Sequence, residues 1–467
     1  MLTVEQLPVS QLMEDSDYIE PSHQVSFASG LQFFSVFVYL LSHGFTIPVL
    51  PIGPSWAVWF RLDDFATLFL FLVYLSTRRN TRPMEKTERL VLSLIVVGIV
   101  FSFPSILVGK LMRPEIIKGP HFGIFQTYRV IQYVTVWFCI RGMSFSSKQF
   151  DKISYTVFFI TLFTVIIGFG NVTGVISASR LVSHLPYDGP WIFVHQKVGS
   201  SRTLGPYGYL SGEMVDRMVF LTMILLASRK PRAIFRISLV ALIACVVFLS
   251  GARAASIAWC VALAIFSCKK AKQLIIAPIV IVLMFVVLRM LPADNRIVEY
   301  STRRISTIVH REEDITMAGR TIQWQEVLET IASDGRIPFM GVGWGFGGQV
   351  LGGAGNAHCM VLQVLLELGI LGLLLFLLLL FGMYRLLRGK DRLLTAVRAG
   401  FLGLLVASLT GEVFYPVSSS GSFLGLVAAV FAISTAACKG RMLEEQYCCE
   451  EYEFAGQEEE LIFQYSV

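Results

Sequence analysis

The sequence has few charged residues for its length. Asp, Glu, Lys and Arg make up only 15% of the 467 residues, whereas soluble domains average about 25%. Apolar residues make up 54%, and the mean hydropathy is +0.65. This composition excludes a soluble globular protein and indicates a membrane protein. The formal charge of +6 is a small surplus, and we expect no nucleic-acid partner.

The beginning of the chain lacks the pattern of a cleaved signal peptide. Residues 1–24 are polar and acidic, whereas a signal peptide has a basic stretch followed by an apolar one. We therefore expect residues 1–26 to be a retained cytoplasmic segment.

Long apolar blocks are what the sequence has instead of charge. A spanning helix needs about 20 apolar residues, with roughly 17 to 25 tolerated, and about twelve blocks qualify. They are continuously apolar and lack the alternation of a membrane β-barrel. The sequence predicts an all-α polytopic membrane protein with about 12 transmembrane helices. The predicted spans are 27–45, 62–75, 90–108, 122–140, 153–172, 210–227, 235–249, 254–268, 274–291, 360–383, 399–413 and 423–438.

The cations gather in every second connection. These connections total 55 residues and hold 20 of the 39 Lys and Arg, at 76–89, 141–152, 228–236, 269–273 and 384–398. The positive-inside rule places them, and both termini, in the cytoplasm. One membrane domain is expected over 27–438, with an acidic cytoplasmic tail over 439–467. Two long periplasmic loops are expected, at 173–209 and, between helices 9 and 10, at 292–359.

Histidines and cysteines are distributed differently on this topology. Six of the seven histidines fall at or near the outer face, which favours chemistry on that side. Of the eight cysteines only Cys359 falls there, so no periplasmic disulfide framework is predicted.

The loop at 292–359 is the richest in motifs. After Gly319 and Arg320, residues 321–333 place Trp324, Val327, Leu328 and Ile331 at helical spacing, which predicts an amphipathic helix on the membrane surface. Residues 338–347 are dense in glycine, so their backbone could approach a ligand closely. Gly343, Gly345 and Gly348 match a G-x-G-x-x-G spacing, but no strand precedes it and no βαβ unit surrounds it, which argues against a dinucleotide site.

His358 and Arg253 stand at predicted boundaries between loop and membrane. Imidazole is the usual base for deprotonating a hydroxyl near neutral pH, and His358 is our candidate; the alternative is a histidine that only caps or anchors the helix. Arg253 lies in the short turn 250–253 between two spans, where its guanidinium suits phosphate oxygens. The alternative for Arg253 is contact with lipid head groups.

Other charged residues are secondary candidates. Arg202 precedes the sixth span and is available to a ligand. Arg129 lies inside the fourth span, where a charge faces the bundle interior or a wet cavity, and Glu367 lies in the tenth. Asp63 and Asp64 could hold a metal, but no ligand cluster accompanies them, and a helix N-terminal cap is the favoured interpretation. We therefore predict no metal and no other cofactor.

In order and predicted topology, these motifs resemble the O-antigen ligase and Wzy-type polymerase family of bacterial inner-membrane glycosyltransferases. Cys359 follows the histidine where the family commonly has Asn. The residues that carry the resemblance are Ser250-Gly251-Ala252-Arg253, Gly319-Arg320 with Trp324, the run from Pro338 to Gly345, and His358 with Glu367-Leu368-Gly369.

The resemblance implies transfer of a glycan from an undecaprenyl-diphosphate carrier to an acceptor glycan at the periplasmic face, without nucleotide or metal. His358 would be the general base, and Arg253, Arg202 and Arg320 would stabilise the leaving diphosphate. Direct attack predicts inversion at the anomeric carbon. We favour polymerisation of O-antigen, capsule or exopolysaccharide repeat units, with a chain-length regulator as a possible further partner. The alternatives are a ligase acting on lipid A core or protein, and a transporter of a lipid-linked glycan or anion.

Overall fold

The computed structural model describes most of the predicted spans and part of the second long loop. The described residues are 23–44, 48–50, 60–77, 83–112, 121–143, 145–176, 211–268, 282, 286, 290, 298–299, 302–303, 315–351, 357–411, 413–415 and 423–440.

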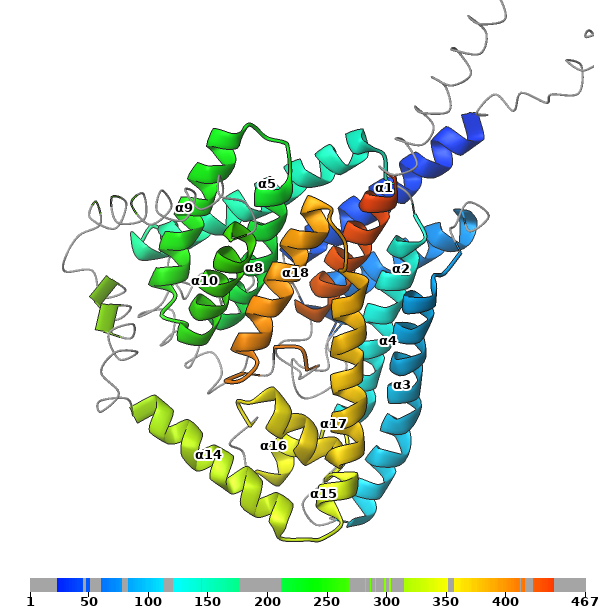
Figure 1. The fold of residues 1–467 in the computed structure, drawn as a ribbon, viewed down its shortest axis with the longest axis vertical. Helices are drawn as coiled ribbons and strands as arrows, with labels where there is room; N and C mark the ends of the chain where they lie inside the picture. Colours follow the sequence, from blue (N-terminus) through cyan, green and yellow to red (C-terminus); the bar gives the residue numbers. More distant parts are fainter. Residues whose placement is uncertain are drawn as a thin grey trace, which may run out of the picture.

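Helices form nearly all of the described structure (Figure 1). The long helices are α1 (His23–Gly44), α2 (Leu62–Thr77), α3 (Lys86–Met112), α4 (His121–Arg141), α5 (Ser147–Val172), α8 (Ser211–Ala227), α9 (Ala233–Leu249), α10 (Arg253–Ser267), α14 (Ile315–Ala332), α17 (Met360–Leu386), α18 (Arg392–Ala407) and Phe423–Gly440. Two single-turn helices, α15 (Ile337–Met340) and α16 (Gly347–Val350), follow α14. The strands β1 (Pro48–Leu50) and β2 (Phe60–Arg61) pair antiparallel, with Pro48 opposite Arg61.

Each predicted span except the ninth overlaps a helix, which confirms the helical prediction for the described residues. The ninth, 274–291, lies almost entirely outside the described residues. Four helices among the described residues are long and apolar enough to cross a membrane, namely α3, α5, α17 and Phe423–Gly440. The helices α9 and α10 are apolar but shorter. The total of twelve spans therefore stays a prediction.

The predicted bounds of the eleventh span, 399–413, are wrong. The helix α18 begins at Arg392 because the Asp391 side chain caps it, accepting hydrogen bonds from the backbone N–H groups of Leu393 at 2.8 Å and Leu394 at 3.3 Å. Hydropathy misses this first part because it contains charged residues, and a side-chain cap starts a helix regardless of hydropathy.

The centre of the bundle is α8. Every residue from Met214 to Ala227 is buried except Asp216, as expected for a helix that is surrounded by other helices. The helices α10 and α18 pack against it and against each other.

The outward face of α3 is apolar. Val100, Phe103, Leu107 and Leu111 are 55–72% exposed. A soluble surface rarely leaves such a contiguous apolar face in water. This face, on a helix long enough to cross a bilayer, therefore indicates contact with lipid.

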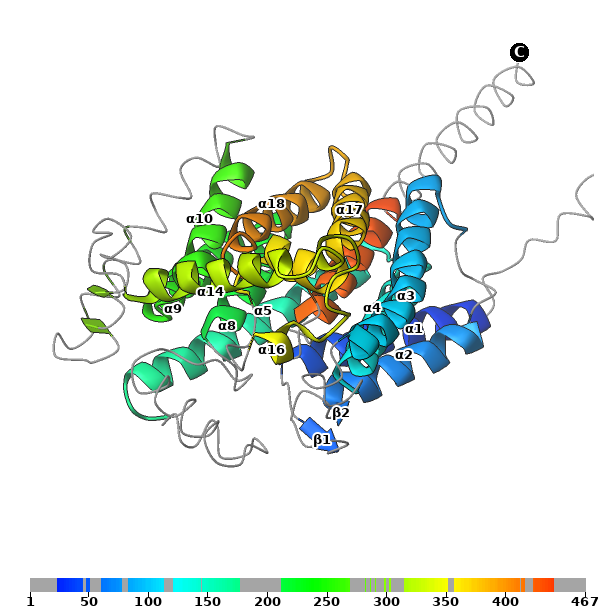
Figure 2. The same cartoon turned by 90° about the horizontal axis from the view of Figure 1, so that it is seen from below.

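The helices α14, α15 and α16 lie together at one end of the bundle (Figure 1), and Figure 2 views the molecule from that end with α14 lying across it. A helix is confirmed over the predicted segment, although it begins at Ile315 and so includes Gly319 and Arg320. Val327 and Ile331 are buried, whereas Leu328 is 53% exposed. That this helix lies on a membrane surface stays a prediction.

Candidate functional site

The helix α17 is broken at Gly369, nine residues after it begins. Gly369 has φ +63° and ψ −167°, which no helix contains. The break frees backbone carbonyls that a continuous helix would use. The carbonyl of Leu366 accepts a hydrogen bond from Val342 N at 2.7 Å, and that of Glu367 accepts one from Gly343 N at 3.0 Å. The glycine-rich segment Gly341–Gly347 is thereby bound to the break.

Two glycines make this close approach possible. Gly341 has φ +72°, and a Cβ there would collide with the carbonyl of Glu367. A Cβ on Gly369 would collide with the carbonyl of Phe339. Both glycines have a positive φ, and backbone atoms of another segment occupy the space that a Cβ would need. Neither position therefore accommodates a residue other than glycine.

We expect Gly369→Ala to lower the free energy of unfolding by about 2 kcal/mol or more, because it adds left-handed strain and a backbone clash. Gly335→Ala is the matched control, since nothing lies within 4 Å of a Cβ there. Thermal unfolding of the purified protein in detergent measures both. Equal melting temperatures for the two variants would contradict the role of this close contact.

The Glu367 carboxylate lies buried beneath the same segment. Oε2 accepts hydrogen bonds from Gly345 N at 2.6 Å and the Tyr415 hydroxyl at 2.7 Å. Oε1 accepts from Gly347 N at 3.1 Å and Gln363 Nε2 at 2.7 Å. Four donors around one carboxylate satisfy it fully despite its burial.

The glycine-rich segment does not present its backbone N–H groups to a ligand. Trp344 N donates to Ser105 Oγ at 3.0 Å and Phe346 N to the Gly343 carbonyl at 3.1 Å. The other four N–H groups from Val342 to Gly347 donate to Leu366 or Glu367. We predicted that these glycines let the backbone approach a ligand closely. For the backbone N–H groups this prediction is wrong, because the segment that they approach and bind is mainly α17.

His358 occupies a turn directly before α17. Its φ is +50°, a left-handed conformation that is uncommon outside glycine. The turn is held on both sides, by a hydrogen bond from Ala357 N to Gln363 Oε1 at 2.8 Å and by one from Met360 N to the Ser408 carbonyl at 3.0 Å. A strained residue held by its surroundings indicates a functional position.

Arg320 lies close enough to act on this imidazole. Burial lowers the pKa of His358 below its ordinary value of 6.5, and the positive charge of Arg320 lowers it further. Both side chains are half-buried. The structure thus brings together two predicted site residues that are 38 positions apart in the sequence.

Arg253 begins α10 at the same end of the bundle. The hydroxyl of Ser250 fixes the preceding turn by accepting a hydrogen bond from Ala252 N at 3.1 Å. Gly403 of α18 packs against Ala258 and Ala262 of α10. The helix α18 runs opposite to α8, because Arg392 at its start donates to the Leu226 carbonyl near the end of α8, and α10 runs along α8, with Trp259 donating to Thr222. The end of α18 at Ser408, whose carbonyl accepts from Met360 N, therefore lies at the same end of the bundle as the start of α10. Arg202 lies outside the described residues.

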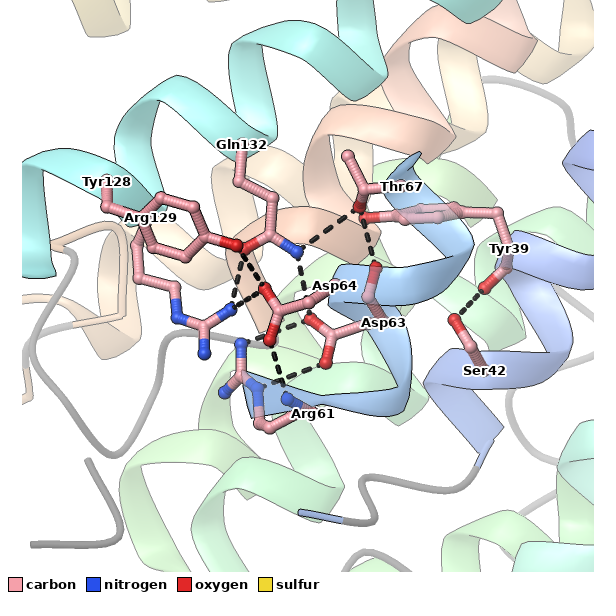
Figure 3. Close-up of polar contacts among 9 residues, drawn as sticks. All are labelled: Tyr39, Ser42, Arg61, Asp63, Asp64, Thr67, Tyr128, Arg129 and Gln132. Carbon is pink, nitrogen blue, oxygen red and sulfur yellow. Dashed lines mark hydrogen bonds and ion pairs between the residues drawn. The ribbon is translucent and has the colours of Figure 1, made fainter. Parts of the chain in front are cut away.

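Asp64 and Arg129 pair with each other. Asp64 Oδ1 accepts hydrogen bonds from Arg129 Nη1 at 2.5 Å and from the Tyr128 hydroxyl at 2.9 Å. Asp64 Oδ2 accepts from Arg61 N at 2.6 Å, so this side chain reaches back over the first turn of α2 as the helix-cap interpretation expects. Figure 3 shows these contacts.

Asp63 pairs with Arg61 in the same network (Figure 3). Asp63 Oδ1 and Oδ2 accept from Arg61 Nε at 3.0 Å and Nη2 at 3.1 Å. Two carboxylates thus face two guanidiniums, which balances their charges. No group of three or more His, Cys, Asp or Glu able to hold a metal occurs among the described residues. This arrangement favours a structural role for Arg129 and Asp64.

The sequence reasoning missed Gln363 and Tyr415 as partners of the site. The signal for Gln363 was present, since two polar residues four apart in an apolar run face the same side of a helix. Tyr415 carried no such signal, because its contact with Glu367 spans 48 residues.

Apolar helices with lipid-facing side chains, and a polar site where a broken helix begins, define a multi-span membrane protein with its candidate site at one end of the bundle. Residues 238–377 match the model of the O-antigen ligase family. This segment is therefore similar to the O-antigen ligase family, which confirms the resemblance found in the sequence over these residues. The matched segment contains Arg253, Arg320, His358 and Glu367. The comparison with curated proteins finds no match.

Proposed function

We propose that the protein polymerises undecaprenyl-diphosphate-linked repeat units of a surface polysaccharide at the periplasmic face of the inner membrane. The observation that carries the proposal is the turn of His358, strained, held on both sides and next to Arg320, within the segment that is similar to the O-antigen ligase family. That family is one of glycosyltransferase-like membrane enzymes acting on lipid-linked glycans.

In the proposed reaction His358 is the general base. Its lowered pKa keeps the imidazole neutral near pH 7, and the neutral ring accepts the proton of an acceptor sugar hydroxyl as its oxygen attacks the anomeric carbon. The bond from that carbon to the diphosphate breaks, and its electron pair leaves with the diphosphate. Direct attack inverts the anomeric configuration and needs no metal.

The arginines stabilise the leaving diphosphate. Guanidinium groups stay protonated and offer several donors to phosphate oxygens. Arg253 and Arg320 reach the end of the bundle that carries His358, and we assign Arg202 the same role. Fixed cations at a boundary of low dielectric stabilise developing negative charge more than water does.

An apolar cavity supports a lipid-linked donor. It lies between α3, α4, α17 and Phe423–Gly440, and Trp344 and Tyr415 line it next to Glu367. Past the break at Gly369 its lining follows α17 from Gly372 to Leu386, which corresponds to about 21 Å of helix. A continuous apolar lining of this length suits a polyprenyl chain whose diphosphate lies near His358.

The pH dependence of transfer tests the proposed base. The sign follows from the lowered pKa: kcat stays constant down to an acidic pH and falls as His358 becomes protonated. Arg320→Met removes the positive charge, so the pKa of His358 rises and the acidic limb of the kcat profile moves to higher pH. Arg320→Lys keeps the charge and leaves the limb near its original position. An identical acidic limb in Arg320→Met and wild type would count against this assignment.

A ligase is the second candidate, because the matching family model is described as O-antigen ligase. A deletion strain distinguishes the two. If the protein is a polymerase, gel analysis of surface polysaccharide shows loss of polymer with single repeats retained, and wild-type protein restores the ladder. Accumulation of full-length carrier-linked chains would show a ligase instead.

A further inference from the structure

The Glu367 carboxylate is connected to the His358 turn through one side chain. Gln363 Nε2 donates to Glu367 Oε1 at 2.7 Å, and Gln363 Oε1 accepts from Ala357 N at 2.8 Å. Gln363, Glu367 and Ala357 are all buried. Ala357 directly precedes His358, so the chain of contacts ends at the strained residue.

The polarity of this connection is fixed at every step. An ionised carboxylate only accepts hydrogen bonds, so it requires the amide NH₂ group of Gln363. The amide oxygen must then point the other way, toward the N–H of Ala357. One carboxylate thereby sets the orientation of the amide, and the amide sets the position of the turn.

The same carboxylate also fixes the glycine-rich segment. Gly345 N and Gly347 N donate to its two oxygens. Gly347 also packs against the hydrogen bond between Gln363 and Glu367. A Cβ on Gly347 would lie 2.6 Å from Gln363 Nε2 and 2.8 Å from Glu367 Oε1. The segment and the His358 turn therefore share one anchor.

We propose that Glu367 and Gln363 are positioning residues that hold the His358 imidazole in line with the acceptor hydroxyl. The inference rests on the proposed function, because it assigns these residues to the base of that reaction. They touch neither donor nor acceptor and act only through the position of His358. Catalysis is sensitive to such placement, since an error of about 1 Å costs on the order of 10²-fold in rate.

The test uses Gln363→Met in the full-length protein reconstituted in liposomes. Methionine keeps the shape of the side chain but makes neither hydrogen bond. We expect kcat to fall about 10²-fold, while KM for the lipid-linked donor stays unchanged. Gln325→Met is the matched control, because it removes the same kind of hydrogen bond, from Gln325 Nε2 to Glu329 Oε1 at 2.8 Å, on the exposed side of α14; its kcat should stay within a few fold of wild type.

A double variant separates positioning from folding. If Gln363 acts only through His358, then Gln363→Met adds no further loss of kcat in a His358→Ala background. A general structural defect would lower kcat by the same factor in both backgrounds and would overturn the proposal. An unchanged kcat in the single variant would also overturn it, with the proposed function intact. No transfer by the wild-type protein would instead overturn both.

Discussion

Replacing His358 with alanine is expected to lower the rate of glycosyl transfer by about 10²- to 10⁴-fold, the contribution of a well-placed general base. A sugar hydroxyl is a poor nucleophile while it keeps its proton, and the neutral imidazole is the group that would accept it. Removing the imidazole leaves the diphosphate contacts in place, so donor binding should persist. The measurement is kcat and donor KM in liposomes with defined donor and acceptor.

The left-handed backbone at position 358 determines the companion variant. Alanine at 358 must still adopt φ near +50°, so His358→Asn, which tolerates that conformation better, is the companion variant. Both should lose transfer equally while inserting at wild-type levels. If His358→Asn kept more than a tenth of wild-type kcat, proton transfer by the imidazole would not be the main contribution of this residue.

Replacing Arg253 with alanine is expected to lower transfer by about 10²- to 10³-fold, as found when one fixed donor to a developing anion is removed. The loss arises because charge develops on the diphosphate as the bond to the sugar breaks. Arg253→Lys should recover part of the rate, since it restores the charge but not the paired donors. Single-turnover assays with a diphosphate-linked donor measure the step directly.

Arg388→Ala is the matched control for Arg253. Arg388 is exposed at the opposite end of α17 from His358, so the same loss of one guanidinium should leave transfer unchanged. Equal effects of the two substitutions would point to a general loss of positive charge and against a diphosphate site at Arg253.

The spans were predictable from sequence because lipid contact needs only apolar length. The apolar runs locate α3, α5 and α17 closely, and the short turn before Arg253 is where the sequence places it. The start of α18 was not predictable from hydropathy, since a single cap at Asp391 decides it. Local chemistry thus overrides composition at helix ends.

The site was predictable only in part. His358 stands at the start of a span, and its residue type indicates a base, so sequence alone pointed to it. The pairing of Arg129 with Asp64 joins residues 65 positions apart, and the contact of Gly341 with the break at Gly369 depends on the fold of the whole loop. The glycine pattern indicated close backbone approach correctly but could not reveal that the partner is α17.

The central claim is that His358 and the arginines form one site for a lipid diphosphate at one end of the bundle. Photo-crosslinking tests it most directly, with an undecaprenyl-diphosphate-linked glycan that carries the reactive group on its first sugar. We predict that peptides containing Arg253 and His358 are both labelled, and that unlabelled donor prevents this. Labelling confined to the opposite end, around Arg388 and Lys390, would contradict the account.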